Sequence, residues 1–283
     1  MNYNNITIGI VAFKSEKVIF KCLKSIKKIK KIIILDNSND LDLKKKIKKK
    51  FPSVKYVLSR KNIGYAAGNN KIFKLAKTSH VMVLNPDTIL NKNCIKLLIS
   101  QSNQLKENFA IIAPLSQPKN YGYFENQFKK RVKSKNLLQV DYVKGFSMLV
   151  NLSKLRKINF FDGNFFLYLE EIDLCKRLKK ASEKIFIARK AKVEHLSAQS
   201  SNIGFEFEKC RNWHWMWSTV YYNIKNNNFV YALKKAFFKI LSNYLKAIFF
   251  IFINSKKSII CYLRASGALN ALMKRKSWYR PKI

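Results

Sequence analysis

The chain has 283 residues, of which 48% are hydrophobic, so it can bury a large core and is neither a disordered tail nor a small disulfide-stabilised protein. Its formal net charge of +40 favours polyanionic partners such as nucleic acid, acidic lipid or diphosphate substrates. Only 9 of the 56 basic residues are arginine, the better residue for bidentate contacts to bases and phosphates. General lysine enrichment therefore explains the charge better than dedicated nucleic-acid recognition.

The spacing of the cysteines and the lengths of the apolar runs indicate the cellular compartment. The five cysteines are widely spaced and include no Cys-x-x-Cys motif, which argues against a disulfide framework or a zinc ribbon and favours a reducing environment. The first residues lack the basic region and cleavage site of a signal peptide. The longest uninterrupted apolar run, 247–253, is far shorter than the ~20 residues of a spanning helix. We expect a cytoplasmic chain without a transmembrane helix.

Apolar runs rich in β-branched residues alternate with segments of helical spacing along the first 150 residues. Strands are predicted at 6–12, 31–37, 54–59, 81–84, 109–114 and 145–150. Such alternation predicts an α/β fold with a mostly parallel sheet covered by helices on both faces. Residues 116–139 lose this periodicity and are predicted to be a loop. A short acidic helix is predicted after 165–168, and no strand pattern returns beyond about Glu206, so we divide the chain into domains 1–205 and 206–283.

Polar residues follow three of the predicted strands. They are Asp36, the segment Arg60 to Gly64, and the segment Asn85 to Asp87. Each alone is explained by a turn or a helix cap, because Asn, Asp and Gly dominate such positions. Parallel sheets bind ligands at the carboxyl ends of their strands, so three such groups on one edge favour a ligand site.

Five motifs in this order resemble the family 2 inverting glycosyltransferases, specifically their rhamnosyltransferase-like branch. The motifs are IIILDNSND, RKNIGYAAGNN, VLNPD, FFDGNFFLYLEEIDLCKRL and VEHLSAQS, and the resemblance runs from Ile6 to about Ser200. It implies a GT-A type fold and a nucleotide-sugar donor, which is a dTDP-, UDP- or GDP-sugar. It also implies a polysaccharide or lipid-linked glycan as acceptor.

The resemblance implies a set of donor-binding residues. Asp36 matches the acid that contacts the nucleoside, and its alternative role is a helix N-cap. Asn62, Gly64 and Asn69 lie in a strand-to-helix turn, where glycine permits close backbone approach and the helix N-terminus favours phosphate. Asn85 occupies the first acidic position of the family's Asp-x-Asp-like motif.

The resemblance also implies a divalent metal, Mg²⁺ or Mn²⁺, that neutralises the leaving diphosphate. Asp87, which ends the Asp-x-Asp-like motif, would be one ligand of this metal. His195 of VEHLSAQS matches the family's late ligand. The alternative for His195 is a hydrogen-bonded histidine of the core.

Inverting transfer requires a carboxylate that takes the proton of the acceptor hydroxyl as it attacks. The family's catalytic aspartate corresponds to Glu171, with Asp173 as the alternative base. Asp173 is also spaced for an i,i+4 ion pair with Arg177. Acids in a first helical turn are otherwise explained by the helix dipole.

The carboxyl-terminal region contains a long amphipathic segment between 229 and 253. Its polar residues Lys235, Lys239 and Lys246 form a narrow stripe on an otherwise apolar helix, with further lysines beyond it. Such a helix lies in a membrane interface or packs inside the protein. The cationic flanks suit anionic lipid, so we predict a peripheral protein on the inner face of the plasma membrane.

Other functions remain open at this point. A polyanion-binding protein would use the net charge as its function, and a degenerate family member would bind the nucleotide-sugar without transfer. A nucleotidyltransferase would need a glycine-rich basic loop after the first strand, where AFKSEK stands instead. We therefore predict a metal-dependent inverting hexosyltransferase, with no specific nucleic-acid partner.

Overall fold

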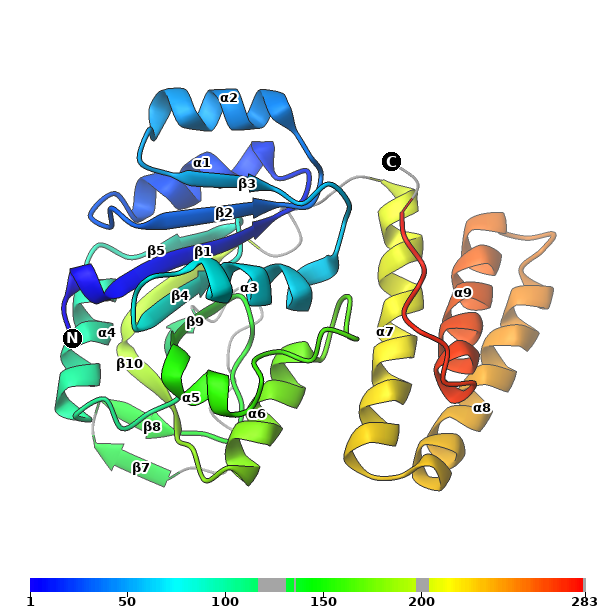
Figure 1. The fold of residues 1–283 in the computed structure, drawn as a ribbon. Coiled ribbons are helices and arrows are strands. Elements are labelled where there is room, and N and C mark those ends of the chain that lie inside the picture. Colours follow the sequence, from blue (N-terminus) through cyan, green and yellow to red (C-terminus); the bar gives the residue numbers. More distant parts are fainter. Residues whose placement is uncertain (117–130, 135, 197–203, 282–283) are drawn as a thin grey trace. The chain divides into compact units, whose positions relative to one another are not determined.

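The computed structural model describes residues 1–116, 131–134, 136–196 and 204–281 (Figure 1). The chain divides into two compact units. The first contains residues 1–162 and continues from Glu171, and the second contains Gly163–Glu170 together with the helical region from Gly204 onward. Each unit is described by itself below.

One half of the sheet in the first unit is entirely parallel. The strands β3 (Lys55–Leu58), β2 (Ile32–Asp36), β1 (Ile6–Ala12) and β4 (His80–Leu84) lie side by side in this order (Figure 1). All four strands were predicted from their apolar runs. Because they run in the same direction, their carboxyl ends share one edge of the sheet.

The other half of the sheet is mixed. Strand β9 (Ser147–Asn151) runs antiparallel between β4 and β6 (Ile111–Ser116), and β10 (Ile185–His195) runs parallel to β6. The short strand β5 (Thr88–Leu90) pairs antiparallel with β10.

The prediction of a loop over 116–139 is wrong for part of that range. Strands β7 (Arg131–Ser134) and β8 (Leu137–Gln139) form there, and β8 pairs with β10. A strand of three or four residues has too few positions for an alternating pattern, so its pairing partner decides its structure. Residues 117–130 lie outside the described residues.

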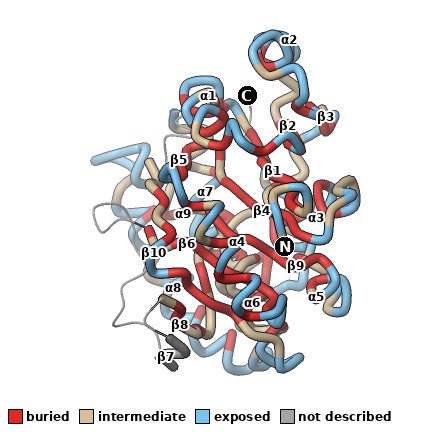
Figure 2. Tube along the Cα trace, turned by 90° about the vertical axis from the view of Figure 1, so that its left-hand side faces the viewer, coloured by how far each residue is buried: buried red, intermediate tan, exposed pale blue. Residues whose placement is uncertain are grey.

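Helices cover both faces of the sheet in the first unit. All seven residues of β1 are buried, as the tube in Figure 2 shows for the central strands. On one of these faces helix α3 approaches so closely that a Cβ added to Gly9 would lie 2.7 Å from Ile72 Cγ2. The helices of this region are α1 (Glu16–Ser25), α2 (Leu41–Lys50), α3 (Gly64–Leu75), α4 (Cys94–Gln104), α5 (Leu152–Lys157) and α6 (Glu170–Lys180), after the 3₁₀ turn η1 (Tyr3–Asn5).

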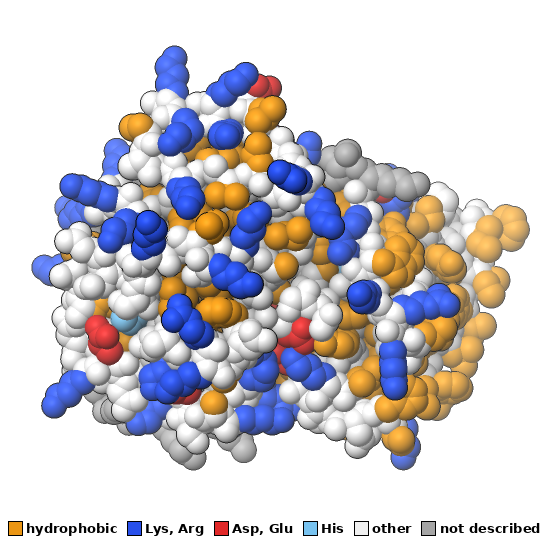
Figure 3. All heavy atoms as spheres, in the orientation of Figure 1, with side chains coloured by type: hydrophobic (Ala, Val, Ile, Leu, Met, Phe, Trp, Pro, Cys, Tyr) orange, Lys and Arg blue, Asp and Glu red, His pale blue; other side chains and the backbone are white. Residues whose placement is uncertain are grey.

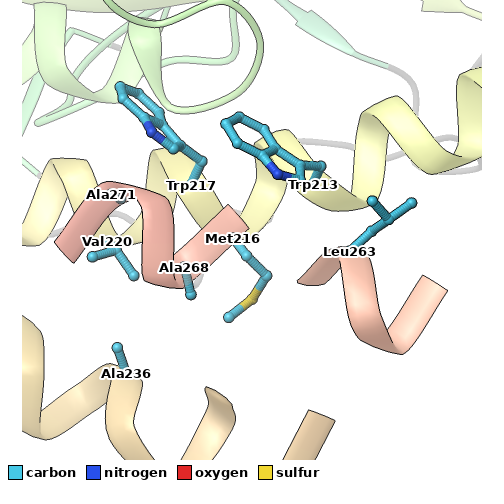
Figure 4. Close-up of a cluster of buried hydrophobic side chains, with 8 residues drawn as sticks. All are labelled: Trp213, Met216, Trp217, Val220, Ala236, Leu263, Ala268 and Ala271. Carbon is cyan, nitrogen blue, oxygen red and sulfur yellow. The ribbon is translucent and has the colours of Figure 1, made fainter. Parts of the chain in front are cut away.

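The second unit is built from α7 (Phe205–Asn226), α8 (Phe229–Phe249) and α9 (Ser255–Leu272). Figure 4 shows their buried core, which consists of Trp213, Met216, Trp217, Val220, Ala236, Leu263, Ala268 and Ala271. Helices α7 and α9 pack closely at Gly267, where an added Cβ would lie 2.3 Å from the carbonyl oxygen of Trp213. Within the described residues, no helix has both the length and the apolar character needed to span a bilayer.

The segment Gly163–Glu170 packs in the core of this helical unit, although it is distant in sequence. The Phe166 ring stacks on His214 with 4.5 Å between ring centroids, and the Ser218 hydroxyl donates a hydrogen bond of 2.8 Å to the Leu167 carbonyl. Tyr168 and Leu169 both have positive φ angles, +72° and +65°, immediately before α6. The sequence division at 205/206 did not include this segment in the second unit.

Candidate active site

The Asp36 carboxylate shapes the loop that follows β2. It is fully buried and accepts hydrogen bonds from the Ser38 backbone N–H (2.8 Å), the Ser38 hydroxyl (2.5 Å) and the Asp40 N–H (2.7 Å). Burial, together with the negative charge of Asp36, raises the pKa of the Tyr56 phenol. Asp36 thus lies at the predicted edge of the sheet, and its contact with a nucleoside stays a prediction.

Asn37 connects two of the predicted donor segments, and sequence reasoning did not single it out. Its side chain donates to the Gly64 carbonyl (3.1 Å) and accepts from the Ile63 N–H (3.3 Å). Its backbone N–H donates to the Ala12 carbonyl at 2.8 Å. One residue therefore joins the ends of β1 and β2 to the start of α3, through its backbone and its side chain. The only signal in the sequence was its place directly after Asp36.

The turn into α3 requires its glycine. Gly64 has a φ of +84°, a region that favours glycine, and its N–H donates to the Asn62 side chain at 3.0 Å. Asn69 lies one turn further along α3, is fully buried and donates to the Tyr65 carbonyl at 3.0 Å. Gly68 serves helix packing, since an added Cβ would lie 3.0 Å from Val11 side-chain atoms of β1.

Asp87 and His195, the predicted metal ligands, lie together. Antiparallel pairing of β5 with β10 places His195 opposite Thr88, and Asp87 Oδ1 lies 3.3 Å from His195 Nε2. Asp87 is 1% exposed, and neither of its carboxylate oxygens accepts a hydrogen bond from any described residue. The remainder of the VEHLSAQS motif, residues 197–200, lies outside the described residues.

A carboxylate buried without hydrogen-bond donors is costly unless a cation compensates its charge. The oxygen atoms of Asp87 and the imidazole nitrogen of His195 therefore fit a divalent ion. Within the described part of the chain, no group of three or more His, Cys, Asp or Glu side chains is arranged to hold a metal. The pair would thus supply part of a coordination sphere. The Asn85 side-chain oxygen, two residues before Asp87, is also buried and accepts no hydrogen bond from the described residues.

Glu171 is half-buried in the first turn of α6. The backbone of Glu171 itself, the charge of Lys144 and the backbone of Ile172 and Gly145 favour the charged form of its carboxyl. Burial outweighs these contacts and raises the pKa of Glu171. A carboxylate with a raised pKa is better matched to accepting a proton from a hydroxyl group near neutral pH.

The segment Lys144–Phe146 contacts both Glu171, the candidate base, and His195, one of the candidate metal ligands. Gly145 contacts Glu171, and its carbonyl accepts a hydrogen bond of 2.6 Å from the Tyr65 hydroxyl. The ring of the next residue, Phe146, stacks on the His195 imidazole with 4.4 Å between ring centroids and an interplanar angle of 8°. Sequence reasoning assigned these residues only to the core. A glycine between a lysine and an aromatic residue was the available signal.

Asp173, the alternative base, is engaged in an ion pair. It is fully buried, and the Arg177 Nε donates to its carboxylate at 2.7 Å, as the i,i+4 spacing predicted. Arg177 Nη1 also donates to the Ile158 carbonyl at 2.6 Å. The geometry of Asp173 is thus that of a residue anchoring α6.

The model for the glycosyl transferase family 2 matches residues 7–175, which is more than half of the chain. The chain belongs to this family. Glycosyl transferase family 2 membership confirms the resemblance, and the matched range contains all the predicted site residues except His195.

Two known proteins are similar to this chain in sequence. The low-salt glycan biosynthesis hexosyltransferase Agl10 of Haloferax volcanii is 28% identical over 197 residues, 62% of this chain and 62% of the relative. The rhamnosyltransferase WbbL of Escherichia coli is 26% identical over 211 residues, 65% of this chain and 78% of the relative. The alignment thus covers less than two thirds of Agl10. The likeness to WbbL agrees with the expected rhamnosyltransferase-like branch.

The fold is shared with a solved structure of the mannosyltransferase PcManGT from Pyrobaculum calidifontis in complex with GDP-Man and Mn²⁺. The TM-score is 0.59 at 11% identity, over 96% of this chain and 88% of the other. The GT-A type fold predicted from the sequence, with a helical carboxyl-terminal region, is thereby confirmed.

Proposed function

We propose that this chain is a metal-dependent inverting glycosyltransferase that moves a hexose from a nucleotide-sugar to a polysaccharide or lipid-linked glycan. The observation that carries the proposal is the placement of two consecutive residues, since Gly145 contacts Glu171 and Phe146 stacks on His195. A candidate base and a candidate metal pair are thus fixed by one short segment inside the range that the family model matches.

The donor diphosphate would lie toward Asp87 and His195. These two residues would hold the divalent cation, which supplies positive charge to the leaving diphosphate when bound. One structural neighbour supports this placement, because PcManGT was solved in complex with GDP-Man and Mn²⁺. Asn62 and Gly64 would contact the nucleotide, because they form the turn at the start of α3, and a helix N-terminus favours phosphate.

Glu171 would act on the acceptor. The acceptor oxygen attacks the anomeric carbon as Glu171 takes its proton, and the bond from that carbon to the diphosphate oxygen breaks with its electron pair on the diphosphate. The raised pKa of Glu171 matches it to this proton transfer. The backbone of Gly145, which lies against the Glu171 side chain, would help to hold the carboxylate in place.

The purified chain should be incubated with Mn²⁺ and a panel of UDP-, GDP- and dTDP-sugars, and its melting temperature measured. At least one donor is expected to raise the melting temperature only when the metal is present. Acceptor transfer is then followed by NMR of the product, whose anomeric configuration should be opposite to that of the donor. No stabilisation by any donor would overturn the proposal, and donor binding without donor hydrolysis or transfer would identify a degenerate relative.

A further inference from the structure

Helix α8 is packed with its small side chains inward and its large side chains outward. Ala232, Ala236 and Ala247 are the buried residues of this helix, at 0%, 2% and 7% exposure. An exposed stripe of apolar residues follows at spacings of three and four and continues past the end of the helix. It consists of Leu233, Phe237, Leu241, Leu245, Ile248 and Phe252, and we call it the α8 stripe.

This arrangement is the reverse of the usual one. A helix that packed only within the unit would bury its phenylalanines, because they gain most from leaving water. Here Phe252 is 97% exposed and Phe238, beside the α8 stripe, is 74% exposed. Figure 3 shows hydrophobic side chains gathered on the surface of the helical unit, with Lys and Arg side chains beside them. An exposed patch of this extent marks an interaction surface.

The charges beside the stripe are all positive. Lys235, Lys239 and Lys246 lie along α8 and are exposed, and Lys256 and Lys257 follow at the start of α9. No Asp or Glu follows Glu208 in the sequence, so helices α8 and α9 contain no side-chain carboxylate. Long lysine side chains beside an apolar face can extend their ammonium groups toward phosphate while their methylenes stay on apolar surface.

We propose that the α8 stripe inserts into the interfacial layer of an anionic phospholipid bilayer, with α8 lying in the plane of the membrane. A large apolar face bordered by lysines, on a helix that does not span the bilayer, has the chemistry of an interfacial helix. A second copy of the chain is a poorer partner for the α8 stripe. It would bring the same lysines together, and neither α8 nor α9 has a carboxylate to pair with them. The proposal goes beyond sugar transfer and does not depend on it.

The test is flotation of the full chain with phosphatidylcholine vesicles, with and without phosphatidylglycerol. Binding is expected to the phosphatidylglycerol vesicles, and it should fall steeply when salt is raised. The double variant Phe238→Ser/Phe252→Ser should lower the partition coefficient by at least about tenfold, because it removes two buried aromatic contacts with lipid. Each of Lys239→Gln and Lys246→Gln should lower it about fivefold. Both phenylalanines are exposed, so these changes leave the core intact.

Leu41→Ser is the matched control, since Leu41 is an apolar residue of α2 with 57% exposure in the other unit. It should bind vesicles as the unaltered chain does. Absence of binding to phosphatidylglycerol vesicles at low salt, or equal binding by the double phenylalanine variant, would overturn the proposal. So would a dimer in light scattering that the double variant abolishes, because the stripe would then be a contact between copies. None of these measurements uses a nucleotide-sugar, so their failure is distinct from failure of the proposed activity.

Discussion

The imidazole of His195 lies 3.3 Å from the buried carboxylate of Asp87, because β5 and β10 pair with Thr88 opposite His195. The pairing brings together two side chains that are far apart in the sequence. It is held further by the Leu196 N–H, which donates to the Asp87 carbonyl at 3.0 Å. The position of this pair is thus set by the backbone of the sheet.

Asp87→Ala is expected to abolish metal-dependent donor binding while the chain stays folded. The carboxylate accepts no hydrogen bond from the described residues, so its removal costs the fold little and relieves a buried charge. The measurement is the donor-induced shift in melting temperature with and without Mn²⁺. Transfer should fall by about 10²-fold or more, as expected when a main electrostatic contact to the leaving group is lost. Unchanged turnover in this variant would remove Asp87 from the site.

Much of the first unit could be predicted from the sequence, because its strands are continuous apolar runs. Strands β1 and β4, for example, are buried on both faces and were predicted from these runs. The roles of Asn37, Tyr65 and Gly145 could not be predicted, since each acts through hydrogen bonds to residues that only the fold brings near.

In the second unit, the sequence predicted helix α8 but not which of its side chains are buried. The sequence predicted a long apolar helix with a lysine stripe, and α8 has both. Hydrophobicity alone would direct Phe238 inward, whereas the structure buries Ala236. Close packing of three helices explains the difference, because small residues allow the backbones to approach and Gly267 does the same for α7 and α9.

Gly267→Ala should destabilise the helical unit. Its added methyl group would lie 2.3 Å from the Trp213 carbonyl oxygen, a backbone atom that moves only with helix α7. Overpacking costs about 1–3 kcal/mol, and a contact this short with backbone belongs at the upper end, which exceeds the gain of ~1 kcal/mol in helix propensity. Gly163→Ala is the control, because an added Cβ there meets no atom within 4 Å. The check is urea unfolding followed by circular dichroism, and equal stability of the two variants would contradict the close contact.

Tyr65→Phe tests whether Tyr65 positions the base. Its hydroxyl donates a hydrogen bond of 2.6 Å to the Gly145 carbonyl, and Gly145 lies so close to Glu171 that an added Cβ would be 3.4 Å from Glu171 Cβ. Loss of one hydrogen bond of about 1 kcal/mol should lower the transfer rate roughly fivefold while donor affinity stays the same. The pH–rate profile should shift as well, because the surroundings of Glu171 relax. Tyr262→Phe, on the exposed side of α9, should change neither rate nor profile.

The pH dependence of transfer should report Glu171. Burial raises the pKa of this carboxyl above its ordinary value of 4.5, and a base must be deprotonated to accept a proton. The rate should therefore fall as the pH falls through this raised pKa, at a higher pH than an ordinary exposed carboxylate would give. Glu171→Gln should lower transfer by about 10²–10⁴-fold, the usual contribution of a general base, and remove this acidic limb. Donor binding should survive in this variant, since the amide keeps the size of the side chain.

Asp173→Asn separates the two candidate bases. Because Asp173 is fully buried and paired with Arg177 at 2.7 Å, the substitution should lower the melting temperature and leave Arg177 with a weaker partner. Transfer per folded molecule should change far less than in Glu171→Gln. Glu171→Asp should keep part of the activity, because it retains a carboxylate with about one methylene less reach. A folded Asp173→Asn variant without transfer, together with normal turnover in Glu171→Gln, would assign the proton transfer to Asp173 instead.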